Sequence, residues 1–117
     1  MRCAVSALGL LAATTALAQA PAQVALGSYE CWAWGSPRML LNLKVTAPGR
    51  YTDPDGSKKG SFVLARDSGL VTFKGGHLDG AMPDNFTAVY HEKNNKPTIS
   101  FRGASGSEAS FCERVGR

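Results

Sequence analysis

Two short stretches of this chain carry residue types that could do chemistry. His77 and Asp79 lie two positions apart in a glycine-rich segment, and a His-x-Asp pair can join a metal site or act in proton transfer. Asp53 and Asp55 lie in Asp-Pro-Asp-Gly-Ser, which has the oxygen ligands of a calcium loop. No second histidine lies close to His77, and no Asp or Glu follows Asp55 until Asp67. We therefore predict no metal, no cofactor, no catalytic residue and no enzyme activity.

The segments that must position these residues have the pattern of short β-strands. Apolar and polar residues alternate over 29–34, 38–45, 50–52, 60–65, 70–74, 86–91, 97–102 and 108–114. Gly, Pro, Asp and Asn residues separate these segments, as they do in tight turns. No stretch keeps a helical period. The pattern predicts an all-β fold, a small antiparallel meander of seven or eight strands.

The N-terminus has the features of a secretory signal peptide. Arg2 is followed by an apolar run that is too short for a stable membrane span, and Ala16-Leu17-Ala18 matches a signal peptidase site. We predict a signal peptide over 1–18, a linker over 19–27 and one β domain over 28–117. The protein is then secreted or periplasmic.

Removal of the signal peptide leaves two cysteines, Cys31 and Cys112. An even number of cysteines in an exported chain predicts one disulfide bond between them. The bond closes a loop of about 80 residues, which removes about 4–5 kcal/mol of entropy from the unfolded state in the chain-entropy view. Because it ties the first strand to the last, we favour a closed barrel over an open sandwich.

The disulfide also bears on the two tryptophans. Phe111 and Cys112 are neighbours on the last strand, so their side chains point to opposite sides. With Phe111 taken as inward-facing, Cys112 and its partner Cys31 face outward, and Trp32 and Trp34 face inward. We therefore predict that both tryptophans belong to the core. The alternative is an exposed aromatic platform for sugar rings.

The stretch 75–85 is the longest without a strand pattern, about twice the length of a typical hairpin connection. One interpretation is a lid, in which Leu78 and Met82 cover one end of the barrel. The other is a binding loop, in which Met82 adapts to a partner and Pro83 limits the entropy lost on binding. The candidate binding residues of this loop are His77, Asp79, Met82 and Asp84.

The charge pattern argues against nucleic-acid binding. The formal net charge is +4, but the basic residues are scattered and the one tight pair is Lys58-Lys59. The order of features (a signal peptide, Tyr29-x-Cys31, a Ser-Gly before a strand, and a C-terminal cysteine) resembles that of small periplasmic lysozyme inhibitors. This resemblance is generic to disulfide-bonded barrels, and it assigns no functional residue.

The hypothesis with most support is an exported, non-catalytic binding module, of which an inhibitor of an envelope enzyme is one form. The alternative is a structural domain associated with carbohydrate or the envelope surface. The partner is then an envelope protein or a cell-wall glycan. No nucleic acid and no stable membrane span after processing are expected.

Overall fold

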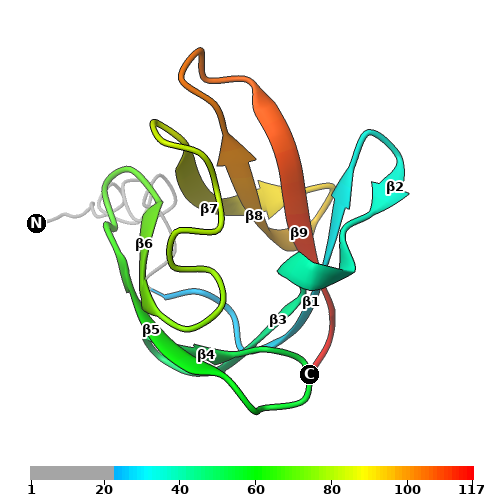
Figure 1. The fold of residues 1–117 in the computed structure, drawn as a ribbon, viewed down its shortest axis with the longest axis vertical. Coiled ribbons are helices and arrows are strands. Elements are labelled where there is room, and N and C mark those ends of the chain that lie inside the picture. The colour runs from blue at the N-terminus through cyan, green and yellow to red at the C-terminus, as the bar shows by residue number, and fades with distance from the viewer. Residues whose placement is uncertain (1–22) are drawn as a thin grey trace, which may run out of the picture.

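The computed structural model describes residues 23–117, and the predicted signal peptide and residues 19–22 of the predicted linker lie outside this range. The chain forms strands joined mostly by short turns (Figure 1). The elements are β1 (Gly27–Ala33), β2 (Ser36–Pro37), the 3-10 helix η2 (Met39–Leu41), β3 (Leu43–Ala47), β4 (Arg50–Thr52), β5 (Lys59–Leu64), β6 (Leu70–Gly75), β7 (Thr87–Lys93), β8 (Lys96–Arg102) and β9 (Glu108–Gly116). Among residues 23–117, no helix is long and apolar enough to cross a bilayer.

The strands form one antiparallel sheet that closes on itself. Their order is β2-β1-β3-β4-β5-β6-β7-β8-β9, and β1 also pairs with β9. Eight strands make the barrel, and β2 is an extra strand that pairs with the end of β1 beyond β3. The predicted all-β class and the closed barrel are confirmed.

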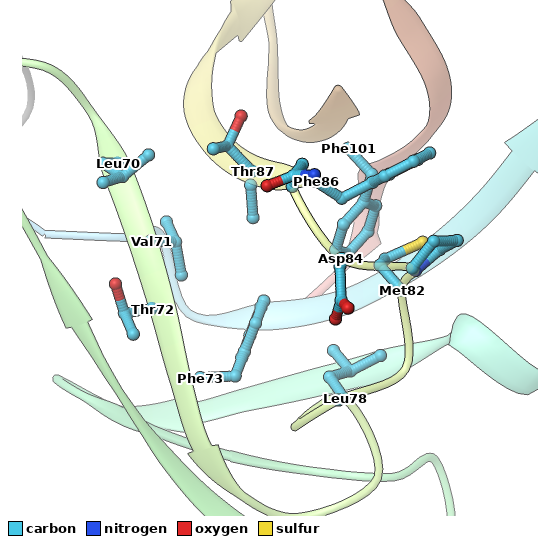
Figure 2. Close-up of a pocket in the computed structure, with 14 residues that line it drawn as sticks. Leu70, Val71, Thr72, Phe73, Leu78, Met82, Asp84, Phe86, Thr87 and Phe101 are labelled. Carbon is cyan, nitrogen blue, oxygen red and sulfur yellow. The ribbon is translucent and has the colours of Figure 1, made fainter. Parts of the chain in front are cut away.

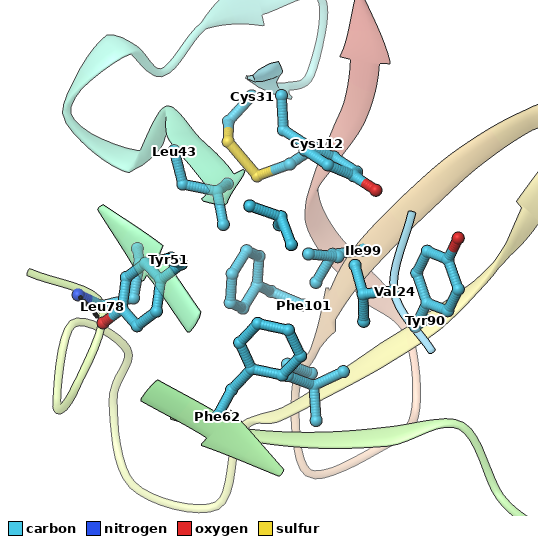
Figure 3. Close-up of a cluster of buried hydrophobic side chains, with 14 residues drawn as sticks. Val24, Cys31, Leu43, Tyr51, Phe62, Leu78, Tyr90, Ile99, Phe101 and Cys112 are labelled. Carbon is cyan, nitrogen blue, oxygen red and sulfur yellow. Dashed lines mark hydrogen bonds between the residues drawn. A yellow bond between two sulfur atoms is a disulfide. The ribbon is translucent and has the colours of Figure 1, made fainter. Parts of the chain in front are cut away.

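The core follows from the alternation of side chains along each strand. Residues two apart point to the same side, so the eight strands of the barrel contribute inward side chains, whereas both residues of β2 are exposed (Figure 3). The buried apolar set comprises Val24, Tyr29, Cys31, Leu43, Val45, Tyr51, Phe62, Val71, Leu78, Ala88, Tyr90, Ile99, Phe101 and Cys112. Val24 is 1% exposed although the sequence places it in the linker 19–27, so packing begins before β1.

The predicted disulfide is present and joins Cys31 of β1 to Cys112 of β9, which lie directly opposite each other. Both cysteines are buried in the core. The prediction that the tryptophans are in the core is therefore wrong. Trp32 lies on the outer side of β1, half-buried, and Trp34 at the end of the β1–β2 hairpin is 83% exposed.

The second predicted strand, 38–45, is also only partly correct. Residues 39–41 form η2 rather than strand, and β3 starts at Leu43. Leu43 and Val45 face the core as expected, but Met39 is 74% exposed. The end of β1, at Trp32 and Ala33, already pairs with β2. The chain therefore forms the short helix η2 before β3 joins the barrel.

Candidate functional site

A cleft opens in the barrel wall where the β6–β7 ladder stops. The ladder has only two residue pairs, Leu70 with Val89 and Val71 with Ala88. Beyond them the strands separate, and the loop 76–86 runs between them. The resulting cavity of about 350 Å³ lies between β6, this loop and the start of β7 (Figure 2).

The local hydrogen bonds show why the ladder ends. The carbonyl of Gly69 accepts a hydrogen bond from the backbone of β7 at 2.8 Å. Alternate residues of a strand direct their backbone groups to the same side, so those of Phe73 also point toward β7. Continued pairing would bring Phe86 opposite Phe73. Instead, the Phe86 amide donates to the Pro83 carbonyl at 3.3 Å, which turns the chain away and leaves the β6 edge facing the cleft.

The loop 76–86 is held to the barrel by the hydroxyl of Tyr51. This hydroxyl donates to the Gly75 carbonyl at 2.6 Å and accepts from the Leu78 amide at 3.1 Å. Burial raises the pKa of the Tyr51 hydroxyl, which keeps it protonated and able to donate. Leu78 is 4% exposed and belongs to the core, so this part of the loop covers one end of the barrel.

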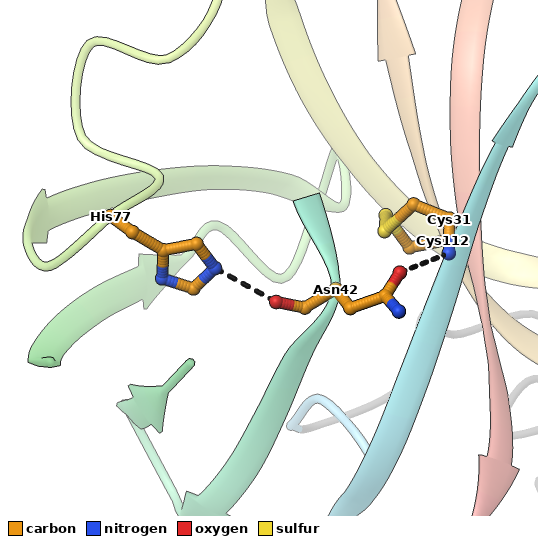
Figure 4. The surroundings of a disulfide bond; sticks show 4 residues. All are labelled: Cys31, Asn42, His77 and Cys112. Atoms are coloured by element: carbon orange, nitrogen blue, oxygen red, sulfur yellow. Dashed lines mark hydrogen bonds between the residues drawn. A yellow bond between two sulfur atoms is a disulfide. The ribbon is translucent and has the colours of Figure 1, made fainter. Parts of the chain in front are cut away.

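Two of the four predicted binding residues, His77 and Asp79, hold the loop in place and are not among the residues that line the cavity. Nε2 of His77 donates to the backbone carbonyl of Asn42 at 2.8 Å, and the side-chain Oδ1 of Asn42 accepts from Cys31 N–H at 2.9 Å (Figure 4). Asp79 Oδ2 accepts from Gly75 N–H at 2.7 Å. His77 and Asp79 therefore bind different backbone groups and do not act as a pair.

The other two predicted residues, Met82 and Asp84, line the cavity. Met82 is half-buried and packs against the core cluster. Asp84 is exposed, and its carboxylate points toward the opening between Phe73 and Leu78 (Figure 2). Neither of the two ion pairs within residues 23–117 includes Asp84. The cleft thus combines apolar walls with one carboxylate that has no cationic partner in the described chain.

The sequence reasoning missed the aromatic walls of the cleft. Phe73, Phe86 and Phe101 line it, from β6, the loop and β8 respectively. The available signal was an aromatic residue on each side of the long loop: Phe73 near the end of one predicted strand and Phe86 at the start of the next. If the β6–β7 ladder included Phe73 and Phe86, these residues would lie opposite each other. The ladder ends before it reaches them, and the cleft forms there.

A second polar cluster lies on the outer face of the barrel, where Ser100 lies between a histidine and a carboxylate. Ser100 donates to Glu108 Oε2 at 2.6 Å, and Nε2 of His91 lies 2.7 Å from the same hydroxyl oxygen. Because the single hydroxyl proton goes to Glu108, His91 must donate, and it cannot act as a base toward Ser100. Ser100 is also fully buried, so a substrate cannot reach it.

Charges around this cluster explain its pKa shifts. Burial, with the charge of Arg102, lowers the pKa of His91. Burial alone would raise the pKa of Glu108, but hydrogen bonds from Lys93 and Ser100 hold it below its usual range. Lys93 contacts Glu108 at 2.8 Å and lies 4.1 Å from the centre of the Phe111 ring. The cluster is a structural network that ties β7, β8 and β9 together.

Metal binding finds no support among residues 23–117, which contain no group of three or more His, Cys, Asp or Glu side chains placed to hold an ion. The loop with Asp53 is a turn: the Asp53 carboxylate accepts from the Lys58 amide and from the Ser57 hydroxyl, both at 2.9 Å.

Comparison of this chain with protein-family models, with curated proteins and with solved structures found no match.

Proposed function

We propose that this protein is an exported, non-catalytic binding module that holds part of a partner protein in the cleft between β6 and the loop 76–86. The observation that carries this proposal is the early end of the β6–β7 ladder. It leaves a cavity lined by both apolar and polar side chains, and a strand edge, open at the same place. Specific recognition usually comes from loops on a rigid framework, and here a disulfide-bonded barrel supplies the framework.

The composition of the cleft indicates the chemistry of the ligand. Phe73, Phe86 and Met82 offer an apolar surface, and thioether and aromatic groups accept varied shapes. Asp84 at the opening complements a positive charge. The ligand that fits best is an apolar side chain beside a lysine or arginine, presented by the partner. An envelope enzyme inhibited by this contact is one such partner.

Two features support the export and the absence of catalysis. A buried disulfide between distant segments is typical of proteins that fold in an oxidising compartment. In the cluster of His91, Ser100 and Glu108, the buried serine lies between the histidine and the carboxylate. A nucleophilic serine needs the histidine between itself and the carboxylate, so this order does not suit nucleophilic attack.

The test places a photo-crosslinking amino acid, benzoylphenylalanine, at position 82 in the cleft. A matched control carries it in place of Val63, which is exposed on the outer face of β5. Both proteins are prepared oxidised and irradiated with an envelope fraction from the secreting host. We expect one discrete protein to crosslink from position 82 and not from position 63, at equal melting temperatures.

Equal crosslinking from both positions would refute the cleft as the binding site. Loss of the crosslink on replacing Asp84→Asn, with stability unchanged, would identify the carboxylate as a contact. Recovery of cell-wall glycan in place of a protein would favour the alternative, a carbohydrate-associated structural domain.

A further inference from the structure

The largest exposed apolar side chains of residues 23–117 gather in one short segment far from the cleft in sequence. Trp34, Met39 and Leu40 are 83%, 74% and 92% exposed, the three highest values among the large apolar residues of 23–117. All three lie within residues 34–40, which we call the apolar tip: Trp34 is in the β1–β2 turn, and Met39 and Leu40 are in η2, which follows β2 (Figure 1). Single exposed apolar residues are ordinary on protein surfaces, but three such highly exposed residues within seven positions indicate an interaction segment.

The apolar tip is held on a rigid base. The Cys31 carbonyl accepts from the Arg38 amide at 2.7 Å, and the Cys31 amide donates to the Asn42 side chain at 2.9 Å. Cys31 is itself fixed to β9 by the disulfide. The β1–β2 hairpin projects from the barrel beside β9 (Figure 1). The apolar groups are therefore presented in a fixed arrangement, which lowers the entropy lost on binding.

The backbone at Trp34 is under strain that packing within this chain does not explain. Trp34 and Gly35 have φ angles of 50° and 78°, the left-handed values at both central residues of a tight hairpin turn. Asn, Asp and Gly are preferred at the first of these positions, and a bulky residue there is uncommon. Because Trp34 is so exposed, its side chain contributes little to the core. A strained residue that does not stabilise the fold points to a binding role.

The charge of the surrounding segment limits the choice of partner. Residues 31–52 contain no Asp or Glu, although the whole chain has nine acidic residues. Arg38 lies inside the apolar tip and is the one charged residue of the stretch 31–43, and the nearest acidic residue in sequence is Glu30 on β1. Apolar side chains together with a local positive charge complement an anionic, partly apolar surface.

We propose that the apolar tip docks on the surface of anionic phospholipid. Trp34 then lies at the level of the headgroups, as tryptophans do at membrane interfaces, and Met39 and Leu40 reach the acyl boundary. Arg38 contacts lipid phosphate. Sugar recognition fits less well, because Met39 and Leu40 offer no hydrogen bonds to hydroxyl groups. The inference does not rest on the cleft, and it concerns surface docking and not a membrane span.

The experiment uses a Trp32→Phe variant, which leaves Trp34 as the single fluorescent reporter. Oxidised protein is titrated with vesicles of phosphatidylglycerol and, separately, of phosphatidylcholine. We expect a blue shift of Trp34 emission with the anionic vesicles, weakened by added salt. Arg38→Gln should lower the partition coefficient about fivefold, which is the usual effect of one basic residue near an anionic surface.

Two further variants separate docking from folding and are measured by vesicle co-sedimentation. Trp34→Asn places a preferred turn residue at the strained position, so it should keep or raise the melting temperature and lower binding by about tenfold or more. Val63→Asn removes an exposed apolar residue elsewhere and should change neither. The proposal is overturned if anionic vesicles leave Trp34 emission unchanged, or if Trp34→Asn binds as tightly as the parent. A shift with a soluble N-acetylglucosamine oligomer but not with vesicles would assign the tip to sugar.

Discussion

The hydroxyl of Tyr51 offers a direct test of how the cleft is built. The ring of Tyr51 packs in the core. Its hydroxyl forms the two hydrogen bonds that hold the start of the loop 76–86 to the barrel. Replacing Tyr51→Phe keeps the ring and removes only this oxygen. We expect the loop to detach locally and the protein to lose stability.

The magnitude follows from the two groups that lose their partner. Gly75 is exposed, so water can replace the bond to its carbonyl, and its loss costs about 1 kcal/mol. Leu78 is 4% exposed, so its amide would remain buried without an acceptor, at about 1–3 kcal/mol. The sum is about 2–4 kcal/mol, a large fraction of the roughly 5–15 kcal/mol that stabilises a typical domain.

Urea unfolding followed by circular dichroism measures the loss, and amide hydrogen exchange locates it. Exchange should accelerate at residues 76–79 more than in β8. The matched control is Tyr29→Phe, because Tyr29 is equally buried and its hydroxyl donates to the Ala25 carbonyl in another part of the barrel. A loss below about 0.5 kcal/mol for Tyr51→Phe, or the same exchange pattern in both variants, would refute this account of the loop.

Two other predictions concern stability. Replacing Cys31→Ser should lower the free energy of unfolding by about 2–5 kcal/mol and leave Cys112 reactive to a thiol probe once the protein is unfolded, whereas reaction of both cysteines in native, unreduced protein would show that no bridge exists. Because the folded state lowers the pKa of His91, the unfolded chain binds the proton more readily, and stability should fall as the pH drops below about 6.5. The slope of unfolding free energy against pH should flatten in His91→Gln, and an unchanged slope would assign the effect to other groups.

Much of the fold could be predicted from the sequence because the signals are local. Alternating residues in β5, β6 and β8 fix which side chains face inward, and glycine or Asp-Gly turns fix where the strands end. The disulfide followed from the number of cysteines, and barrel closure followed from its position in the first and last strands.

The two tryptophans were wrongly predicted to lie in the core because the wrong face of β9 was taken as the inward one. Alternation correctly placed Phe111 opposite to Cys112, but it does not say which side is inside. The large apolar side chain of Phe111 suggested that it points inward, whereas the buried side chains of this strand are Ser110 and Cys112. At the line where the barrel closes, the disulfide itself fills the space that a large aromatic ring would need, so the rings of Phe111 and Trp32 lie outside.

The cleft could not be predicted, for a different physical reason. Its walls come from residues far apart in sequence, and it exists because one ladder stops after two pairs. The turn at Pro83 that ends this ladder is visible in the sequence, but its effect on the opposite strand is a property of the closed sheet. Met82 and Asp84 lie on the loop and line the cavity, but the cavity itself was not foreseen.

The bond between Cys31 and Cys112 also sets how the protein responds to mechanical force. These residues lie 81 positions apart and face each other on β1 and β9. A pull applied between the two ends of the chain therefore passes from β1 to β9 through the sulfur atoms. The backbone between them carries almost no tension. The barrel and its cleft can thus stay folded under a load on the termini until the disulfide is reduced.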